Sequence, residues 1–391
     1  MRVLLFHQYF KTPEEGSGIR SYYLAKAFQQ AGYQVKVISG HNSTSGEQTI
    51  DGIPVHYFKV PYSNYQGFLS RVLAFLRFVS ASKKLLKHDH EYDLLYVLST
   101  PLTTGLIALY AKKKFGIEYL FEVGDLWPLA PIQMGAIKPA LIQNKLYQFE
   151  ERVYKDARLL VGLSPSIKQA MEYTIDYSKE VHVLSNMSDC SFFQKSKNIP
   201  PEFNTQSPLI IGYQGAIGRA NHLEYLVMLA EAVLKKGLPV EIRIMGDGAQ
   251  KKRIEKLSAQ LSNIIWITEG GKNEVREELS NCHISYISYA PFPVLETGSP
   301  NKLFDGLAAG KLIILNFKGW MSELVTKHKC GFSYNVNNIE EAVSFLQSMI
   351  KNPLLLEAYQ NNARELAASR FDVSHITQNA VKLLASQGVT N

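Results

Sequence analysis

Short apolar runs, each followed by a loop and a helical pattern, recur along this chain and constrain its fold more than any other feature. In the second half these runs begin at Leu209, Val240, Ile264 and Ile284, and each leads to a loop that contains glycine or proline. Uninterrupted apolar runs of this kind are typical of parallel strands, because helices cover both faces of such a sheet. The alternation therefore predicts an α/β protein built on parallel sheets.

The first half opens with the same alternation and a glycine loop. The run Val3–Phe6 is followed by Gly16 and Gly18, then by a helical pattern, and then by a second run, Val35–Ile38. Two glycines without a third are weak evidence for a dinucleotide site. Two interpretations remain open: the loop lets a substrate approach the backbone, or it is a plain tight turn. Further strands are predicted at 93–98, 119–123, 159–163 and 181–184, and 53–58 is predicted to be an edge strand.

A polar, proline-rich segment at 194–208 separates the two halves. A chain of 391 residues is too long for one compact core, so the alternation on each side predicts two domains. We expect two Rossmann-like domains facing a central cleft, with bounds near 1–192 and 205–372. The last helices are predicted at 339–350, 353–368 and 374–387, and the final segment, 374–391, is expected to pack back on the first domain.

Charge and cysteine content narrow the class of protein. The net charge of +7 allows nucleic acid, an anionic membrane or phosphorylated substrates as partners. Cys190, Cys282 and Cys330 lie far apart, which argues against a disulfide framework or a zinc site and fits a reducing compartment. No uncharged apolar run reaches the ~18 residues that span a bilayer, and no signal-peptide pattern follows Met1. We therefore expect a cytoplasmic protein.

One amphipathic basic helix is predicted at 66–87. Residues 61–90 hold five Lys or Arg and a single acid, Asp89, so this segment carries +4 of the chain's +7. Such a helix can lie in an anionic membrane surface, or it can pack its apolar face on the sheet, and both interpretations remain. Basic charge confined to one aromatic-rich helix disfavours nucleic acid. Its apolar face is predicted to hold Phe68, Val72, Phe75, Val79 and Leu86, widened by Leu69, Leu73 and Leu76.

The segment 296–311 has the pattern of an anion-binding turn. A turn-forming Gly298-Ser299-Pro300-Asn301 leads into a helix of small residues, and the apolar run 312–315 follows as a buried strand would. Unpaired amides and the helix dipole at such a start favour negative charge. Lys302 adds a point charge suited to phosphate, and Asp305, one turn on, can accept hydrogen bonds from sugar hydroxyls. The segment is therefore predicted to hold the diphosphate of a nucleotide sugar.

Polar residues also follow two other predicted strands. Glu122 and Asp125 lie at the end of the strand 119–123, where open α/β sheets bind ligands. Asp125 has an alternative role, as a cap of the turn around residues 127–128. In the second half, the strand 209–213 leads to a glycine loop with Gly215, Gly218 and Arg219.

On these motifs the chain resembles the GT-B retaining glycosyltransferases of family 4, and within them the bacterial amino-sugar (L-fucosamine-type) transferases. The motifs are residues 16–20, 121–128, 215–219 and 299–311, and the resemblance covers nearly the whole chain. It implies transfer of a sugar, an N-acetylated amino or deoxy sugar, from a nucleotide diphosphate sugar that family habit makes UDP-linked. The implied acceptor is a glycan or lipid-linked glycan in surface polysaccharide, O-antigen or capsule synthesis.

The resemblance also implies roles for individual residues. Asp305 would contact the donor ribose, and the family's first donor-loop glutamate falls on Thr297 or, with a one-residue shift, on Glu296. Asp125, with Glu122 behind it, would be the polar group nearest the reacting sugar. No D-x-D motif is present, so Arg219 and Lys302 would supply positive charge in place of a metal, and no cofactor is implied. The expected donor-binding residues are Gly16, Gly18, Gly215, Gly218, Glu296, Thr297, Gly298, Ser299, Asn301, Lys302, Leu303 and Asp305.

The acceptor is expected to approach through residues 16–20 and the loop of Asp125. A polyprenyl-diphosphate sugar is an attractive acceptor, because the helix 66–87 would hold the enzyme peripherally on the inner face of the plasma membrane. Two alternatives from other classes are a nucleotide-sugar epimerase of the GT-B type and a non-catalytic nucleotide-sugar-binding protein.

Overall fold

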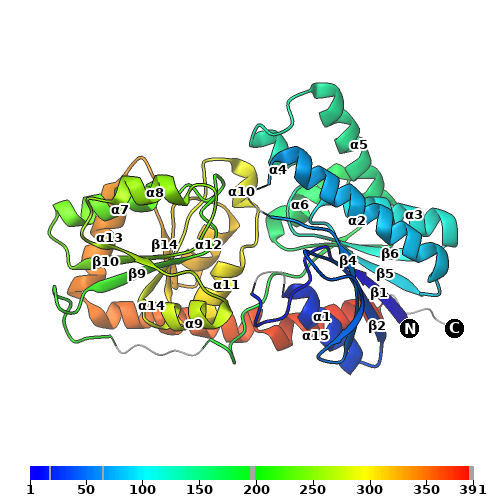
Figure 1. Ribbon diagram of the computed structural model, residues 1–391. Coiled ribbons are helices and arrows are strands. Elements are labelled where there is room, and N and C mark those ends of the chain that lie inside the picture. The colour runs from blue at the N-terminus through cyan, green and yellow to red at the C-terminus, as the bar shows by residue number, and fades with distance from the viewer. Residues whose placement is uncertain (17–18, 64–65, 194–198, 387–391) are drawn as a thin grey trace. The chain divides into compact units, whose positions relative to one another are not determined.

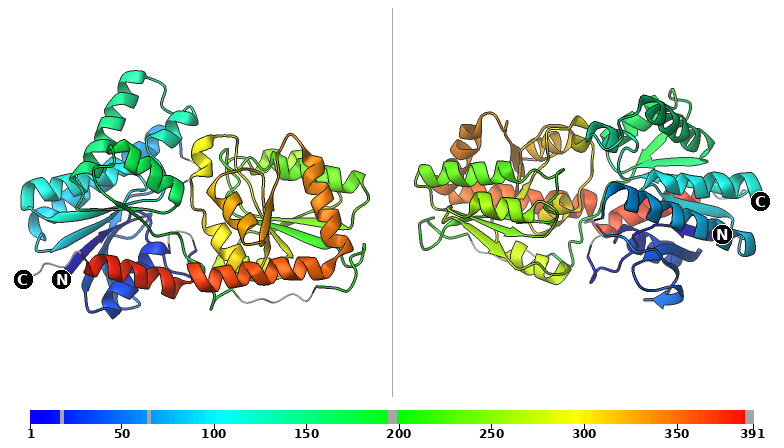
Figure 2. Two further views of the ribbon diagram at one scale, coloured as in Figure 1. Left: turned by 180° about the vertical axis from the view of Figure 1, so that it is seen from behind. Right: turned by 45° about the horizontal axis from the view of Figure 1, so that its top comes forward.

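The computed structural model describes residues 1–16, 19–63, 66–193 and 199–386. The chain forms two compact units. The first holds Met1–Ser185, Thr297–Ser299 and the chain from Ile376 onward, and the second holds Asn186–Glu296 and Pro300–His375. Each unit is a largely parallel sheet with helices on both faces, as the views in Figure 1 and Figure 2 show. The prediction of two Rossmann-like α/β domains is therefore confirmed.

The sheet of the first unit has eight strands in the order β3-β4-β2-β1-β5-β6-β7-β8. All neighbours are parallel except β3 and β4, which form an antiparallel hairpin. The strands are β1 (Arg2–Phe6), β2 (Gln34–His41), β3 (Gly46–Ile50), β4 (Ile53–Lys59), β5 (Leu94–Leu98), β6 (Glu118–Val123), β7 (Leu159–Gly162) and β8 (Val181–Val183). The predicted edge position of 53–58 is wrong, because β4 pairs with β2 on one side and β3 on the other.

Helices cover both faces of this sheet in the way that right-handed crossovers require. The strand order reverses between β1 and β5, so α1, which joins β1 to β2, lies on the face opposite α2, α3 and α5 (Figure 1). The helices of the first unit are α1 (Arg20–Gln30), α2 (Phe68–His88), α3 (Gly105–Phe115), α4 (Leu129–Gln133), α5 (Ala140–Asp156) and α6 (Pro165–Thr174), with a 3₁₀ turn at Leu102–Thr104.

The long helix α2 confirms the predicted helix at 66–87 and divides its apolar residues between two faces. Phe75, Val79 and Leu86 are buried, whereas Leu69, Leu73 and Leu76 are 76%, 53% and 46% exposed. The packing interpretation is therefore correct for the first group. The three leucines form a separate, outward apolar face. No helix in the described part of the chain has the length and apolar character needed to cross a bilayer.

The sheet of the second unit has six parallel strands in the order β11-β10-β9-β12-β13-β14, so the order reverses beside β9. Loops at the carboxyl ends of strands around such a reversal form the usual ligand site of this architecture. The strands are β9 (Leu209–Gln214), β10 (Val240–Met245), β11 (Ile264–Ile267), β12 (Ile284–Ile287), β13 (Leu312–Leu315) and β14 (Gly331–Ser333).

Apolar residues from these strands and from α7 and α13 form the core of the second unit. The helices of the second unit are α7 (Glu224–Lys235), α8 (Lys251–Ser258), α9 (Lys272–Ser280), α10 (Pro293–Glu296), α11 (Asn301–Ala308), α12 (Trp320–Lys327), α13 (Ile339–Lys351) and α14 (Pro353–Leu366). The last helix, α15 (Val373–Ala385), belongs to the first unit from Ile376 onward. A π-helical turn, Ala367–Phe371, lies between the last two helices. The helices predicted near 339–350 and 353–368 are thus present, and the third begins at Val373.

Candidate active site

Lys302 lies in the first turn of α11, beside the strand where the second sheet reverses its order. Its Nζ donates a hydrogen bond of 3.0 Å to the Tyr213 hydroxyl and lies 4.2 Å from the centre of that ring. Burial lowers the pKa of Lys302 to about 7. No carboxylate of the described residues forms an ion pair with it. A desolvated ammonium that only an aromatic ring and a hydroxyl contact is well suited to bind an anion.

Gly215, the first residue after β9, has no side chain, so the Lys302 ammonium can lie close to its backbone. A Cβ at Gly215 would lie 3.0 Å from Lys302 Nζ, and its φ of +148° belongs to the region that favours glycine. The neighbouring loop after β10 packs backbone to backbone, since a Cβ at Gly246 would overlap the Gly215 carbonyl oxygen. The Ile217 amide also donates to the Asp247 carbonyl at 2.8 Å. The structure thus brings Lys302 and the predicted glycine loop together.

Two other predicted residues of this loop have no such constraint. A Cβ at Gly218 would meet only Asn221 Oδ1, at an ordinary 3.6 Å, so the backbone does not require glycine there. Arg219 is exposed. A charge contribution from Arg219 therefore stays a prediction.

Asp305, one turn after Lys302, is half-buried, and burial raises the pKa of its carboxyl to about 7. The nearby positive charge of Lys272 opposes that rise in pKa. Lys272 begins α9 and is 6% exposed, and its Nζ has no hydrogen-bond partner among the described residues. It lies 5.1 Å and 5.4 Å from the ring centres of Phe192 and Phe193. A buried, unpaired cation near a candidate ribose ligand is a functional candidate.

Sequence reasoning missed Lys272, although a signal was present. Lys272 follows the turn residues Gly270 and Gly271 at the start of a helix, just as Lys302 follows the turn 298–301 at the start of α11. Its burial could not be foreseen, because the two phenylalanines that cover it lie about eighty residues earlier in the chain.

The other residues of the predicted donor segment have different surroundings. Glu296 ends α10, and Gly319, with φ +94°, leaves space for its side chain: a Cβ there would lie 3.6 Å from Glu296 Oε2. Thr297–Ser299 belong to the first unit, where the Ser164 hydroxyl donates to the Thr297 carbonyl at 2.6 Å. Gly298 and Ser299 are buried, whereas Asn301 is exposed.

Leu303 requires a correction. Its side chain is fully buried in the second unit, and its amide donates to the Pro300 carbonyl at 3.1 Å. Neither the side chain nor the amide N–H is thus available to a donor. Leu303 anchors α11 in the core, in keeping with its place on the apolar side of that helix.

In the first unit, Glu122 is a buried ion-pair partner, which corrects its predicted catalytic role. The Arg20 guanidinium donates to its two carboxylate oxygens at 2.6 Å and 2.9 Å, and the Tyr96 hydroxyl donates to Oε2 at 2.5 Å. Arg20 also donates to the carbonyls of Leu184 and Ser185. Glu122 is 1% exposed and both oxygens are occupied, so it cannot contact a sugar. It holds β6, α1 and the chain after β8 together.

Asp125, three residues further on, is exposed. Its carboxylate forms no hydrogen bond with any described residue, so the alternative role of capping the turn at 127–128 is not observed. Loss of hydration next to the surrounding protein atoms raises the pKa of the Asp125 carboxyl. Gly124 allows close packing of the loop, because a Cβ there would lie 3.2 Å from Thr100 Oγ1. Asp125 thus keeps the access that a substrate-contacting residue needs.

The loop after β1 contains a histidine that sequence reasoning did not single out. His7 is buried, its Nδ1 lies 2.6 Å from the Ser21 hydroxyl, and burial together with the charge of Arg20 lowers its pKa to about 3. The ring is therefore neutral at physiological pH. Gly16 has φ +79°, as a tight turn requires. Gly18 lies outside the described residues.

In the residues that the structure describes, no group of three or more His, Cys, Asp or Glu side chains is arranged to hold a metal ion. Lys302 lies within the segment that is predicted to hold the diphosphate.

Two family models match the chain in tandem. Residues 15–186 match the glycosyl transferase 4-like domain, and residues 194–366 match the glycosyl transferases group 1 domain. The first unit, which carries Asp125, and the second unit, which carries Lys302, thus correspond to the two domains of a GT-B glycosyltransferase. The chain belongs to this glycosyltransferase class.

Curated relatives are distant and match over part of their length. Over 208 residues the chain is 25% identical to TuaH of Bacillus subtilis, named as a glycosyltransferase of teichuronic acid biosynthesis, covering 50% of each chain. Over 206 residues it is 20% identical to a poly(ribitol-phosphate) alpha-N-acetylglucosaminyltransferase of Staphylococcus aureus, covering 52% of this chain and 40% of that protein. The chain spans about half the length of the curated relatives it matches, or less.

Solved structures match over nearly the full length. Sucrose-phosphate synthase from Thermosynechococcus elongatus superposes with a TM-score of 0.76 at 15% identity, covering 99% of this chain and 98% of that one. HepE from Anabaena, solved in complex with UDP-glucose, gives a TM-score of 0.72 at 17% identity, covering 99% and 100%. At these identities the likeness confirms the fold.

Proposed function

We propose that this chain is a retaining glycosyltransferase that moves an N-acetylated amino sugar or a deoxy sugar from a UDP-linked donor to a glycan or lipid-linked glycan of a surface polysaccharide, such as a capsule or O-antigen. The tandem glycosyltransferase domains support the reaction class. The relatives named for teichuronic acid and for poly(ribitol-phosphate) modification support a surface polymer as the acceptor. HepE, solved with UDP-glucose, supports UDP as the nucleotide.

The single observation that carries the proposal is the unpaired ammonium of Lys302 against the glycine loop after β9. It lies at the carboxyl edge of the sheet, next to the start of α11. We assign the hydrogen bonds to the donor ribose to Asp305 on the same helix, and binding of the diphosphate to Lys302. Lys272, near Asp305, adds a second cation on the nucleotide side.

The chemistry follows from the donor. The anomeric carbon–oxygen bond to the diphosphate breaks, a new bond forms from that carbon to the acceptor oxygen, and the acceptor proton passes to the departing phosphate on the same face. Preorganised positive charge on the leaving phosphate lowers the barrier most effectively where water is excluded. We assign this charge to Lys302 and to the exposed Arg219, which can rotate toward a bound diphosphate, without a metal ion. No pair of carboxylates at glycosidase spacing is required.

In the first unit, Asp125 is the residue that contacts the reacting sugar or the acceptor hydroxyl. Its exposed carboxylate is not committed to another described residue. Glu122 acts only through Arg20 and Tyr96, by fixing β6 and hence the loop that carries Asp125.

We further propose that the protein binds peripherally to an anionic membrane surface through α2. The outward leucines Leu69, Leu73 and Leu76 lie on the same helical face as Lys84 and Lys87, which are exposed. Apolar side chains that insert, combined with lysines that meet anionic headgroups, are the two features of an interfacial helix.

A donor screen tests the proposed function. The released nucleotide is measured for UDP-, GDP- and dTDP-sugars, with and without a lipid-linked glycan acceptor. We expect acceptor-dependent UDP release with a UDP-linked N-acetylated amino sugar or deoxy sugar. Conversion of one UDP-sugar into another without release of UDP would identify an epimerase instead, and binding without turnover would indicate a non-catalytic protein.

A further inference from the structure

Asn316, the first residue after β13, holds the backbone of Tyr289 at the carboxyl edge of the second sheet. Its Oδ1 accepts a hydrogen bond from the Tyr289 N–H at 2.9 Å, and its Nδ2 donates to the Tyr289 carbonyl at 3.0 Å. Asn316 is buried, so both bonds are shielded from water. A side chain that satisfies both backbone groups of one residue continues the pairing beyond the end of the strands. The position of Tyr289 is therefore fixed before a ligand binds.

The Tyr289 ring lies against Phe317, with the ring centres 4.7 Å apart and the planes tilted by 37°. Ile287 is in register with Leu315, and the two aromatic residues follow them by two positions, so both lie on the same face of the sheet. Phe317 is buried, whereas Tyr289 is half-buried. The pair thus presents one supported aromatic surface at the end of β12.

The loop that carries Tyr289 is joined to the loop after β9, against which Lys302 lies. The strands β12 and β9 pair, and beyond them the Ala290 N–H donates to the Ala220 carbonyl at 2.8 Å. The Lys302 ammonium donates to the hydroxyl of Tyr213 in β9. Burial raises the pKa of this hydroxyl, and the neighbouring Tyr289 raises it further. Tyr289 therefore lies next to the position assigned to the donor diphosphate.

A carboxylate, that of Glu296, lies between the same two loops. Gly319 follows Phe317 by two residues, and a Cβ at Gly319 would be 3.2 Å from Glu296 Cβ. Glu296 is half-buried, and its carboxylate forms no hydrogen bond or ion pair with a described residue. An aromatic surface for C–H groups and an available carboxylate for hydroxyls are two features that suit a sugar.

The order of groups in a nucleotide sugar places the transferred sugar on this side of Lys302. The sugar and the ribose are attached to opposite ends of the diphosphate. Asp305, to which we assign the ribose, lies one turn after Lys302 in α11, whereas Glu296 lies before the start of that helix. With the diphosphate at Lys302, the sugar therefore extends toward Glu296 and Tyr289.

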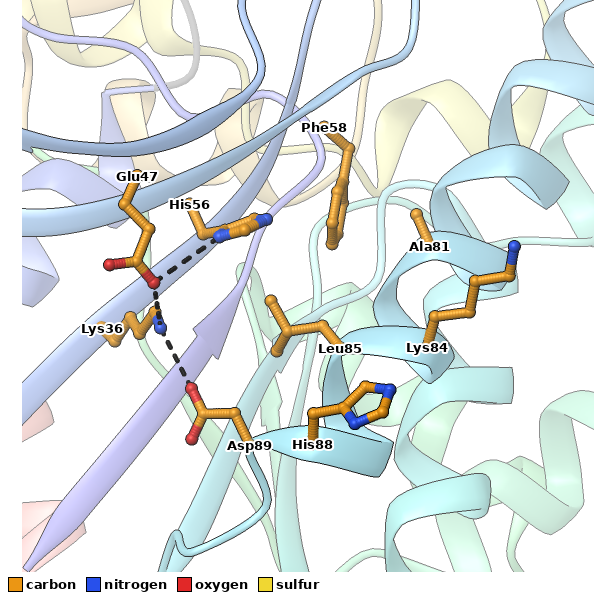
Figure 3. A pocket seen from close by; sticks show the side chains of 9 residues that line it. All are labelled: Lys36, Glu47, His56, Phe58, Ala81, Lys84, Leu85, His88 and Asp89. Carbon is orange, nitrogen blue, oxygen red and sulfur yellow. Dashed lines mark hydrogen bonds and ion pairs between the residues drawn. The ribbon is translucent and has the colours of Figure 1, made fainter.

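A cavity in the first unit offers no comparable arrangement (Figure 3). It has a volume of about 420 Å³ and is lined by Phe58 together with residues of β2, β3 and α2. Both of its carboxylates are already paired with Lys36, Glu47 at 2.7 Å and Asp89 at 3.0 Å. Its carboxylates are therefore engaged, unlike that of Glu296.

We propose that the Tyr289 ring binds a methyl group of the transferred sugar and thereby selects the donor, while Asn316 and Phe317 hold the ring in place. The methyl group is that of an acetamido substituent or of a 6-deoxy sugar. Glu296 accepts hydrogen bonds from the sugar hydroxyls. This inference rests on the proposed glycosyl transfer and names the residue that sets the preference for the sugar. Tyr289 contacts the substrate, and Asn316 is a positioning residue.

Titration calorimetry tests this assignment without turnover, with UDP-N-acetylglucosamine, UDP-6-deoxyglucose, UDP-glucose and UDP as ligands. We expect the wild type to bind one of the two methyl-bearing sugars at least about tenfold more tightly than UDP-glucose, which is within the range for one small apolar group in an apolar pocket. The preferred one of the two identifies the source of the methyl group. Equal affinities for all three nucleotide sugars would overturn the proposal.

Variants of Tyr289 test whether its ring carries this preference. Tyr289→Ala should reduce the preference to less than threefold and leave the affinity for UDP within twofold, whereas Tyr289→Phe, which keeps the ring, should retain the preference. Tyr359→Ala, which removes another half-buried tyrosine of the second unit, is the control and should also retain it. A Tyr289→Ala protein with the full preference would refute the assignment.

Variants of Asn316 test its positioning role. Asn316→Ala should reduce the preference as Tyr289→Ala does, and Asn316→Asp, which keeps the acceptor for the Tyr289 N–H, should restore part of it. A loss of stability alone would not change the ratio of the two affinities. An unchanged ratio in Asn316→Ala would show that Asn316 does not position the ring.

Transfer assays separate this inference from the proposed function. Normal transfer without a preference among the three nucleotide sugars would refute the role of Tyr289 alone. Absence of transfer with every donor and acceptor would refute the proposed function, whereas the ratio of binding affinities would still report on the aromatic surface.

Discussion

Two cations of this chain, Arg20 in the first unit and Lys302 in the second, have opposite surroundings. Arg20 is buried and donates hydrogen bonds to both oxygens of Glu122 and to two backbone carbonyls. Lys302 has a hydroxyl and a ring as neighbours, and no carboxylate pairs with it among the described residues. A buried charge with every partner in place is a structural element, whereas a desolvated charge that lacks a counter-ion awaits a ligand.

The largest effect is expected when the satisfied pair is broken. Glu122→Ala leaves the Arg20 guanidinium buried without its counter-ion, and loss of one partner of a buried pair costs about 3–5 kcal/mol. We expect a marked fall in the unfolding temperature of the first unit, measured by scanning calorimetry. The matched control is Glu151→Ala, which removes the partner of Lys155 in an exposed pair on α5 and should leave the unfolding temperature unchanged. A full loss of activity with unchanged stability in Glu122→Gln would restore its catalytic role.

The unsatisfied cation should behave in the opposite way. Lys302→Met removes the charge that binds the departing diphosphate, so we expect kcat to fall at least tenfold. The unfolding temperature should stay the same or rise, because a desolvated, unpaired ammonium is replaced by an apolar side chain of similar length. Lys327→Met, an exposed lysine of α12, is the control and should change neither quantity. Near-normal sugar transfer by Lys302→Met would refute the assigned role.

Lys302 and Glu122 show which residue roles can be predicted from the sequence and which cannot. The sequence singles out Lys302 and Asp305 because the signal is local: a turn, a helix start and a buried strand lie within the eighteen residues 298–315. Glu122 was misassigned because its partner Arg20 lies 102 residues away, and only tertiary packing shows that its two oxygens are occupied. The burial of Lys272 could not be predicted for the same reason, because Phe192 and Phe193, which lie against it, are distant in sequence.

The strands show the same contrast between a local sequence signal and one that appears only in the folded structure. Apolar runs such as Leu312–Leu315 predict the buried parallel strands. The edge strand β3 went unnoticed because Gly46–Ile50 has no apolar run and is held mainly by backbone pairing with β4. Edge strands with polar side chains are common because they resist further pairing.

The smallest effect is expected at the membrane surface, where solvent screens the charges. Each lysine near an anionic bilayer contributes about 1 kcal/mol, so reversing two of them should weaken binding at least tenfold. We expect Lys84→Glu with Lys87→Glu to reduce binding to vesicles that contain anionic lipid, measured by flotation. The matched pair Lys113→Glu with Lys114→Glu on α3 should have less effect. Equal flotation of the wild-type protein with neutral and anionic vesicles would contradict the membrane proposal.

The pH dependence of UDP binding tests the central claim, that Lys302 binds the donor diphosphate, most directly. Its pKa is lowered to about 7 in the free protein, and a bound diphosphate favours the charged form and raises that pKa. Above pH 7.5 Lys302 of the free protein is mostly the neutral amine, which must take up a proton when UDP binds, so the affinity should fall by up to about tenfold per pH unit as the pH rises. Phosphate itself has finished titrating in this range, since its second pKa is about 6.

Titration calorimetry between pH 7.5 and 9, in two buffers of different ionisation enthalpy, measures both the affinity and the proton uptake. We predict proton uptake and falling affinity for the wild type, and weak, pH-independent binding without uptake for Lys302→Met. Identical pH profiles and proton uptake in the two proteins would contradict the account.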